Sequence, residues 1–211
     1  ITAADLQTGD DVDITSTGTI TVDDQIDGAT IDLTAATDIA LNAGLAAATS
    51  VSATATAGSI TWTAGTIDTV AAALTAGDSI GAAGAAVEIQ SDTLTLNTTG
   101  GVIGGAVSVS LIGNATEVDA STFDVGATDI DISQTGGDLT LDTDVSGQAI
   151  DISSDNAILR RSGTITATGL AALFGETGLG NATDALQVDA ASAALVTDLT
   201  TDNDGAVVNI D

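Results

Sequence analysis

The chain has 211 residues, of which 30 are acidic and 2 are basic, and its formal net charge of −28 opposes binding to nucleic acid and to anionic membrane surfaces. Hydrophobic residues make up 44% of the sequence, too many for a disordered acidic tail, yet no apolar run approaches the roughly 18 residues of a membrane span, so we expect no membrane insertion. Because His, Cys and Lys are absent, Ser–His and Cys nucleophiles, Schiff-base lysines and the usual zinc ligands are excluded.

Apolar and polar residues alternate over short stretches along the chain, and this period of two predicts half-buried β-strands. Around Gly28–Gly44 we expect Ile31, Leu33, Ile39 and Leu41 to point inward. The clearest alternating stretches are 19–22, 31–33, 59–62, 94–96, 130–132, 139–141, 150–152 and 165–166.

Three Ala-rich segments, 44–50, 70–77 and 170–176, are the only helical candidates, and each is too short to stand alone as a helix. We expect loops that break the strand pattern at 44–50 and at 170–181. The N-terminal ITAADLQTGD has neither an initiator Met nor the basic and apolar regions of a signal peptide, so we expect a mature product or a piece of a longer protein.

Similar phrases return about every 20 residues, as in GTITV, TDIAL, GSITW and GDSIG, which begin at Gly18, Thr37, Gly58 and Gly77. Such a period indicates stacked units, and a rung of two or three short strands predicts an all-β parallel β-helix, or β-solenoid, with roughly 20-residue rungs. A coarser correspondence of 99 to 100 residues relates 31–33 to 130–132. We therefore expect residues 1–211 to form one continuous β-solenoid of two similar units, approximately 14–112 and 113–211.

An alternative fold is two tandem β-sandwiches of about 100 residues each, with Ca²⁺ between them. It would explain the coarse correspondence and the acidity, but not the 20-residue period. Strand direction separates the two folds, because a sandwich pairs its strands antiparallel and a solenoid pairs them parallel.

Segments 79–92 and 178–191 resemble a phrase of the filamentous-haemagglutinin-like giant repeat surface proteins of bacteria. Each has an Ile-Gly or Leu-Gly pair, a small-residue loop and an apolar–polar alternation, at 80–81 and 87–89 and again at 179–180 and 186–189. A Pro of the family phrase falls on Ala86 and Ala185, which is a departure. The resemblance implies a right-handed parallel β-helix, an extracellular or cell-surface location, and a place in a secreted adhesin or surface fibre without catalytic residues.

One loop is a candidate metal site. In DLTTDNDG, at 198–205, Asp202, Asn203 and Asp204 resemble part of a Ca²⁺ loop, since this hard cation prefers oxygen ligands. The loop lacks the full alternating ligand set and a distal Glu, and a solvated turn is the competing interpretation. No cofactor is required by the sequence, whereas some divalent binding along so acidic a chain is expected.

Other motifs allow a functional and a structural interpretation. Three N-x-T sequons, at Asn97, Asn114 and Asn181, are candidate glycosylation sites, although so Thr-rich a chain contains some by chance. Trp62 is expected to plug the core rather than to stack on a sugar. Arg160 and Arg161, the two cations, should face opposite sides of a strand, and one of them should pair with a surface Asp. The Thr-x-Thr pairs suggest either an ice-binding array or simply residues that favour strands. They lie at 19/21, 54/56, 61/63, 93/95 and 164/166.

These observations predict a structural role rather than an enzyme. The chain is expected to build a fibre or rod-like stalk of a large surface protein, with copies of itself or flanking solenoid repeats as end-to-end partners. An adhesin segment that binds a glycan or another cell surface is the main alternative. A polysaccharide-active enzyme using paired carboxylates, and an ice-binding solenoid, are weaker alternatives.

Overall fold

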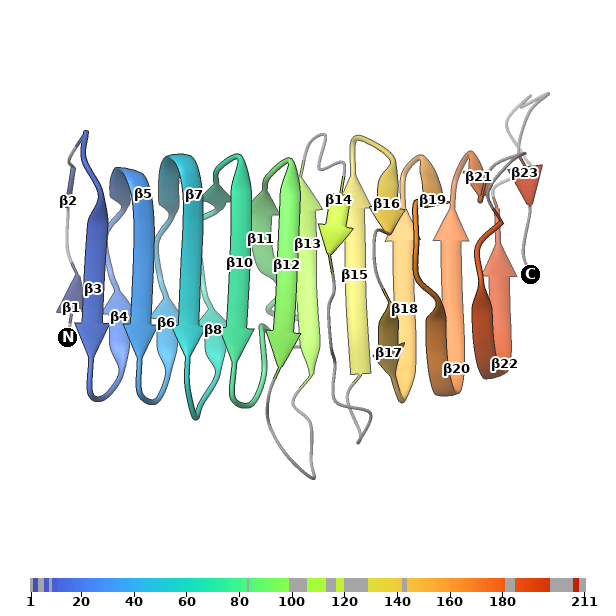
Figure 1. Ribbon diagram of the computed structural model, residues 1–211, viewed down its shortest axis with the longest axis horizontal. Helices are drawn as coiled ribbons and strands as arrows, with labels where there is room; N and C mark the ends of the chain where they lie inside the picture. The colour runs from blue at the N-terminus through green and yellow to red at the C-terminus, as the bar shows by residue number, and fades with distance from the viewer. Residues whose placement is uncertain are drawn as a thin grey trace.

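The computed structural model describes residues 2–3, 6–7, 9–82, 84–98, 106–112, 117–119, 129–141, 144–180, 185–197 and 207–208. Within these ranges every regular element is a β-strand and none is a helix. The strands stack side by side along one axis, from β1 (Thr2–Ala3) at one end to the last strands at the other (Figure 1). The chain is therefore an elongated all-β solenoid, as predicted.

One parallel ladder, which we call face A, continues from rung to rung. Two of its members, β5 and β7, are long strands that contribute only their second halves to this face, after a bulge or bend near residues 28–30 and 48–50. Face A consists of β3 (Val12–Ser16), β5 (Ile26–Ala35), β7 (Leu45–Ala55), β10 (Ala71–Ala76), β12 (Thr93–Thr98), β14 (Glu117–Asp119), β16 (Leu139–Leu141), β19 (Ala157–Arg160), β21 (Gly178–Leu179) and β23 (Val207–Val208).

A second ladder, which we call face B, is also parallel throughout. Single bridges through Ile80 connect its early strands to its later ones. Besides β1, face B consists of β4 (Ile20–Val22), β6 (Ile39–Leu41), β8 (Ile60–Trp62), β13 (Val107–Ile112), β15 (Asp129–Thr135), β18 (Ala149–Ser154), the second half of β20 (Ile165–Gly175) and β22 (Val188–Val196).

The remaining strands close the coil between these faces. In the N-terminal half, β2 (Leu6–Gln7), β9 (Ile67–Asp68) and β11 (Val87–Gln90) pair in parallel with the first halves of β5 and β7 and with β13. Further along, β17 (Val145–Gly147) pairs with the first half of β20. All strand-to-strand pairings of the described residues are parallel, which contradicts the alternative of two tandem sandwiches.

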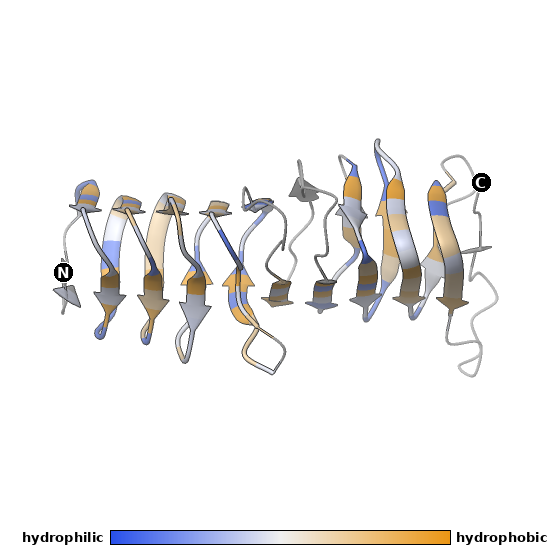
Figure 2. Cartoon of the chain, turned by 90° about the horizontal axis from the view of Figure 1, so that it is seen from below, coloured by the Kyte–Doolittle hydropathy of each residue, from blue (hydrophilic) through white to orange (hydrophobic). Residues whose placement is uncertain are grey.

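The core is a set of ladders of apolar side chains that point inward. On face B the ladder has steps of 19 to 27 residues, most of them close to the predicted 20, and the longest step leads from Ile80 to Val107. Apolar colour recurs from rung to rung along the rod in Figure 2. This ladder consists of Ile20, Ile39, Ile60, Ile80, Val107, Ile130, Ile150 and Ala171, all of them buried.

The inward and outward assignments made from the alternation are confirmed where it was clearest. Ile31, Leu33, Ile39 and Leu41 are all at most 1% exposed, whereas Asp32, between two of them, is exposed. The two expected loops are wrong: residues 45–50 belong to β7, and 170–179 lie mostly in β20 and β21. Buried and exposed positions still alternate over much of these segments. The sequence does not reveal this alternation, because Ala and Gly occupy both kinds of position.

The correspondence of about 100 residues has a structural counterpart with an unexpected feature. Ile31 in β5 and Ile130 in β15 are both buried, and each of these strands is followed by a turn and a further strand, β6 and β16. Ile31 nevertheless lies on face A, and Ile130 lies on face B. Conversely, Ile39 lies on face B and its counterpart Leu139 on face A. Equivalent segments of the two predicted units thus occupy different faces of one stack.

Candidate functional site

Several turn aspartates have a structural task. Each lies in a turn before a strand, and its carboxylate accepts a hydrogen bond from a backbone N–H of the following rung. Three such bonds join Asp38 Oδ1 to Ser59 N at 2.9 Å, Asp138 Oδ1 to Ala157 N at 3.1 Å and Asp144 Oδ1 to Thr164 N at 2.8 Å. A charged acceptor for a backbone N–H is a strong partner, so part of the acidity stabilises the coil.

Other carboxylates stack one rung apart on the outer surface. Asp13 is in register with Asp32, and Asp131 is in register with Asp151. Partial burial, followed by the neighbouring Asp151 carboxylate, raises the pKa of Asp131 above its usual 3.8. These pairs alone do not form a metal centre: the described residues contain no group of three or more His, Cys, Asp or Glu side chains suited to a metal ion.

The predicted calcium site lies outside the described residues, because Asp202, Asn203 and Asp204 all fall within 201–206. Two of the three sequons, at Asn114 and Asn181, also fall outside them. Asn97 is described: it is half-buried on β12, in register with Thr75. Calcium binding and glycosylation therefore stay predictions.

A ladder of threonines on the outer surface of face A was not evident from the Thr-x-Thr pairs. Its members come from successive rungs, and the neighbouring outward column contains Asp13, Asp32, Ser52 and Ala73 rather than a second row of threonine. The hydroxyl array of these rungs is therefore one residue wide. The ladder consists of Thr15, Thr34, Thr54 and Thr75.

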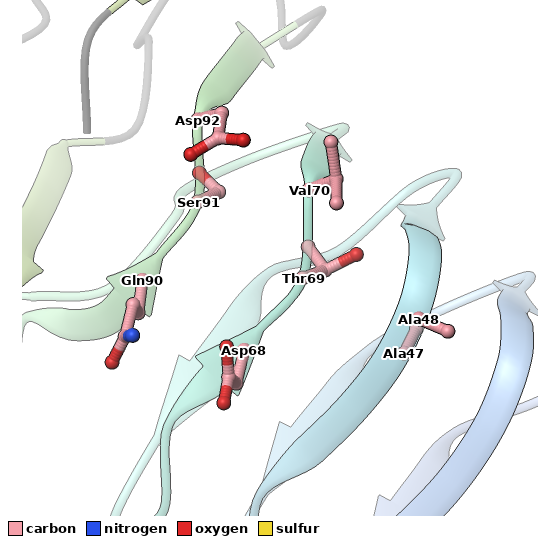
Figure 3. A pocket seen from close by; sticks show the side chains of 8 residues that line it. All are labelled: Ala47, Ala48, Asp68, Thr69, Val70, Gln90, Ser91 and Asp92. Carbon is pink, nitrogen blue, oxygen red and sulfur yellow. The ribbon is translucent and has the colours of Figure 1, made fainter. Parts of the chain in front are cut away.

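A groove of ≈ 450 Å³ runs along a corner of three successive rungs in the N-terminal half (Figure 3). Two buried side chains in it, Thr69 and Ser91, have hydroxyls with no hydrogen-bond partner. Its walls are formed by Ala47, Ala48, Asp68, Thr69, Val70, Gln90, Ser91 and Asp92.

The side chains of this groove do not converge on one point. In Figure 3 the polar ends of Asp68 and Gln90 point away from Asp92, and the Thr69 hydroxyl points in a different direction again. General acid–base catalysis and cation binding both require groups aimed at one place. The groove offers neither arrangement, and it contains no aromatic side chain on which a sugar ring would stack.

Trp62 and Arg160 occupy matching turns about 100 residues apart. Trp62 Nε1 donates to the Gly65 carbonyl at 2.7 Å, and Arg160 Nε donates to the Gly163 carbonyl at 2.6 Å. Both glycines have positive φ, 88° and 80°, which the tight turn requires. Trp62 is half-buried against the core, as expected, and Arg160 is half-buried while Arg161 is exposed. The Arg160 guanidinium thus supports a turn rather than a ligand site.

The described residues contain no helix long and apolar enough to cross a membrane. Comparisons with protein-family models, with curated proteins and with solved structures found no match to this chain. The parallel ladders and the recurring turns define the class of protein: a β-solenoid repeat protein.

Proposed function

We propose that this chain is a structural segment of an extracellular fibre or rod-like stalk, lengthened by stacking further solenoid rungs onto its ends. Those rungs would come from copies of itself or from flanking solenoid repeats. One observation carries the proposal: among the described strands β22 pairs only with β20, so its other edge has no partner there. Leu195 of β22 is in register with the buried Leu173, yet it is 38% exposed.

The geometry of the stack explains why a further rung would add at this edge. Internal strands such as β5, β7 and β18 have a parallel neighbour on both sides. The buried Leu173 lies in register between Ile152 and Leu195. A strand placed on β22 in the same register would satisfy its open backbone groups and cover Leu195 as β22 covers Leu173. The extracellular location rests on the resemblance to haemagglutinin-like surface proteins.

Electron microscopy of the purified chain tests end-to-end stacking. At high concentration we expect filaments whose power spectrum has a meridional spacing of about 4.8 Å, the distance between neighbouring strands. Leu195→Asp would place a charge at the open end of the core and should abolish the filaments. Val70→Asp, at a side chain 50% exposed on another rung, is the matched control and should leave them intact. Isolated short rods under all conditions would contradict the proposal.

The alternative of an adhesin segment is supported by the corner groove alone. If the groove binds a glycan, Gln90→Ala, at an exposed side chain, should reduce binding on a glycan array, whereas Gln25→Ala, at an exposed position elsewhere, should not. Equal binding by both variants would remove the groove as a recognition site.

A further inference from the structure

The exposed apolar side chains of this acidic protein gather at one place. Among the described residues, five large apolar side chains are exposed. One of them, Val70, lies alone in the N-terminal half. The other four belong to the neighbouring strands β20 and β22: Leu170, Phe174, Leu195 and Val196, with exposed fractions of 45%, 38%, 38% and 51%.

Most of this apolar surface lies on the outside of face B, not at the end of the stack. Along one outward column, Asp131 and Asp151 are followed by Ala172 and Ala194. The same register positions thus change from carboxylates to methyl groups between β18 and β20, which lie side by side near the C-terminal end in Figure 1.

The next outward column changes in the same way. Ser133 and Ser153 are followed by Phe174 and Val196. Leu170 lies two residues before Ala172 and extends the surface along β20. We call Leu170, Ala172, Phe174, Ala194 and Val196 the apolar patch. Contiguous exposed apolar surface of this kind marks an interaction site more often than isolated apolar residues do.

The charge around the apolar patch identifies its partner. Residues 156–197 contain three acidic residues, Glu176, Asp184 and Asp189, and both arginines, so their net charge is −1, and the whole of 156–211 carries −5. Residues 1–155 contain 23 acidic residues and no basic ones. Two copies of this chain would repel one another least where these nearly neutral rungs meet.

We propose that the apolar patch is the surface through which two copies of this chain associate side by side. A two-fold axis through the patch would bring Phe174 and Val196 of each copy onto the same surface of the other. The rods would overlap at their C-terminal rungs, and the acidic N-terminal halves would point in opposite directions. Because the same surface is used by both copies, assembly closes at two, unlike end-to-end stacking.

Salt distinguishes this contact from the capture of a basic partner. The Debye length falls from about 10 Å at 0.1 M salt to about 3 Å at 1 M, so salt screens repulsion between the two acidic rods without weakening an apolar contact. Self-association should therefore strengthen with salt. Binding of a basic, amphipathic peptide to the apolar patch would instead weaken with salt. If such a peptide binds and the chain does not self-associate, the proposal is overturned.

Sedimentation velocity of the purified chain in 0.05 M and 0.5 M NaCl is the first test. We expect a monomer–dimer equilibrium whose dissociation constant falls with salt. The triple variant Leu170→Thr, Phe174→Ser and Val196→Thr changes only outward side chains and should raise that constant at least ~10-fold. Val70→Thr is the control and should leave it unchanged. A chain that stays monomeric at 200 µM in 0.5 M NaCl would overturn the proposal.

Cysteine cross-linking gives a second test that leaves the apolar anchors in place. The chain has no cysteine, so one introduced thiol reports one position. Ala172→Cys lies in the apolar patch, and Ala73→Cys lies at a half-buried outward position on β10. Under mild oxidation Ala172→Cys should form disulfide-linked dimers several-fold faster than Ala73→Cys. Equal rates would contradict a contact at the apolar patch.

The outcome also separates this inference from the proposed fibre. If Leu195→Asp abolishes association and the triple variant does not, the contacts are end to end and the side-by-side dimer is wrong. The reverse result would establish the dimer and count against the filament. If both variants still associate, both contacts are contradicted.

Discussion

Ile39 is an internal member of the face B ladder, fully buried, with Ile20 and Ile60 in register on either side of it. Ile39→Ala removes three carbons from this position. Their transfer out of water contributes about 2.4 kcal/mol, at roughly 0.8 kcal/mol per carbon. The backbone hydrogen bonds hold the neighbouring rungs at a fixed spacing, so the cavity collapses poorly and adds about 1–2 kcal/mol. We expect a total loss of about 4 kcal/mol.

Urea unfolding followed by circular dichroism measures this loss. Ile39→Val removes one carbon and should cost about 1 kcal/mol, which tests the dependence on volume. Thr61→Ala, at an exposed side chain on the adjacent rung, is the control and should change stability by less than about 0.5 kcal/mol. If Ile39→Ala costs less than 1 kcal/mol, the inward ladder does not carry the stability of the coil, and the reasoning fails.

Three further perturbations test the turns and the outer surface. Gly58→Ala would place a methyl group on the turn carboxylate that caps its rung and should lower stability by about 2 kcal/mol, whereas Gly18→Ala, with open space around it, should be nearly neutral by the same unfolding assay. Asp144→Ala removes a 2.8 Å acceptor of a backbone N–H and should cost about 1 kcal/mol, with Asn at this position restoring most of it in thermal melts. Because the pKa of Asp131 is raised in the folded state, the stability that its neutral form contributes is present below pH 3.8 and lost as the pH rises through the raised value. Asp131→Asn should therefore raise the melting temperature at pH 7 and not at pH 3. Equal effects at both pH values would refute a charge-based cause.

The solenoid was predictable because its two determinants are local and repetitive. Alternation over three to five residues places Ile31 and Leu33 inward without reference to the rest of the chain. A period near 20 residues then requires that successive rungs present the same side chains to one another. Aromatic residues and prolines, which would mark the corners of a sandwich, are nearly absent. These signals depend only on the sequence within one or two rungs.

Which ladder a segment joins was not predictable. Ile31 and Ile130 begin nearly identical phrases, yet they lie on different faces, because every short strand of this coil has the same local pattern and fits either ladder. The choice depends on the length of the connections, such as the 27-residue step from Ile80 to Val107. The loops expected at 44–50 and 170–181 are wrong for a related reason. Alanine fits buried and exposed strand positions equally, so an Ala-rich strand shows no apolar–polar alternation in the sequence.

The candidate sites were less predictable because they arise from register between rungs. The carboxylate of Asp38 looks like a solvated turn residue in the sequence, and only the stack brings it to the N–H of Ser59, 21 residues later. The apolar patch is equally hidden, since Phe174 and Val196 are 22 residues apart and become neighbours through one pairing. A single-residue motif search finds neither.

The distribution of charge gives these features a common physical explanation. An open sheet edge can pair with a strand of another molecule, and an exposed apolar surface can adhere to one, so both features favour unwanted association. Twenty-three uncompensated acidic residues over 1–155 make lateral contact between rods unfavourable along most of their length. Only the rungs of 156–197, with a net charge of −1, allow close approach. The acidity therefore restricts lateral association to the C-terminal rungs, where Phe174 is exposed, whereas the axial contact at Leu195 is separate from this lateral repulsion.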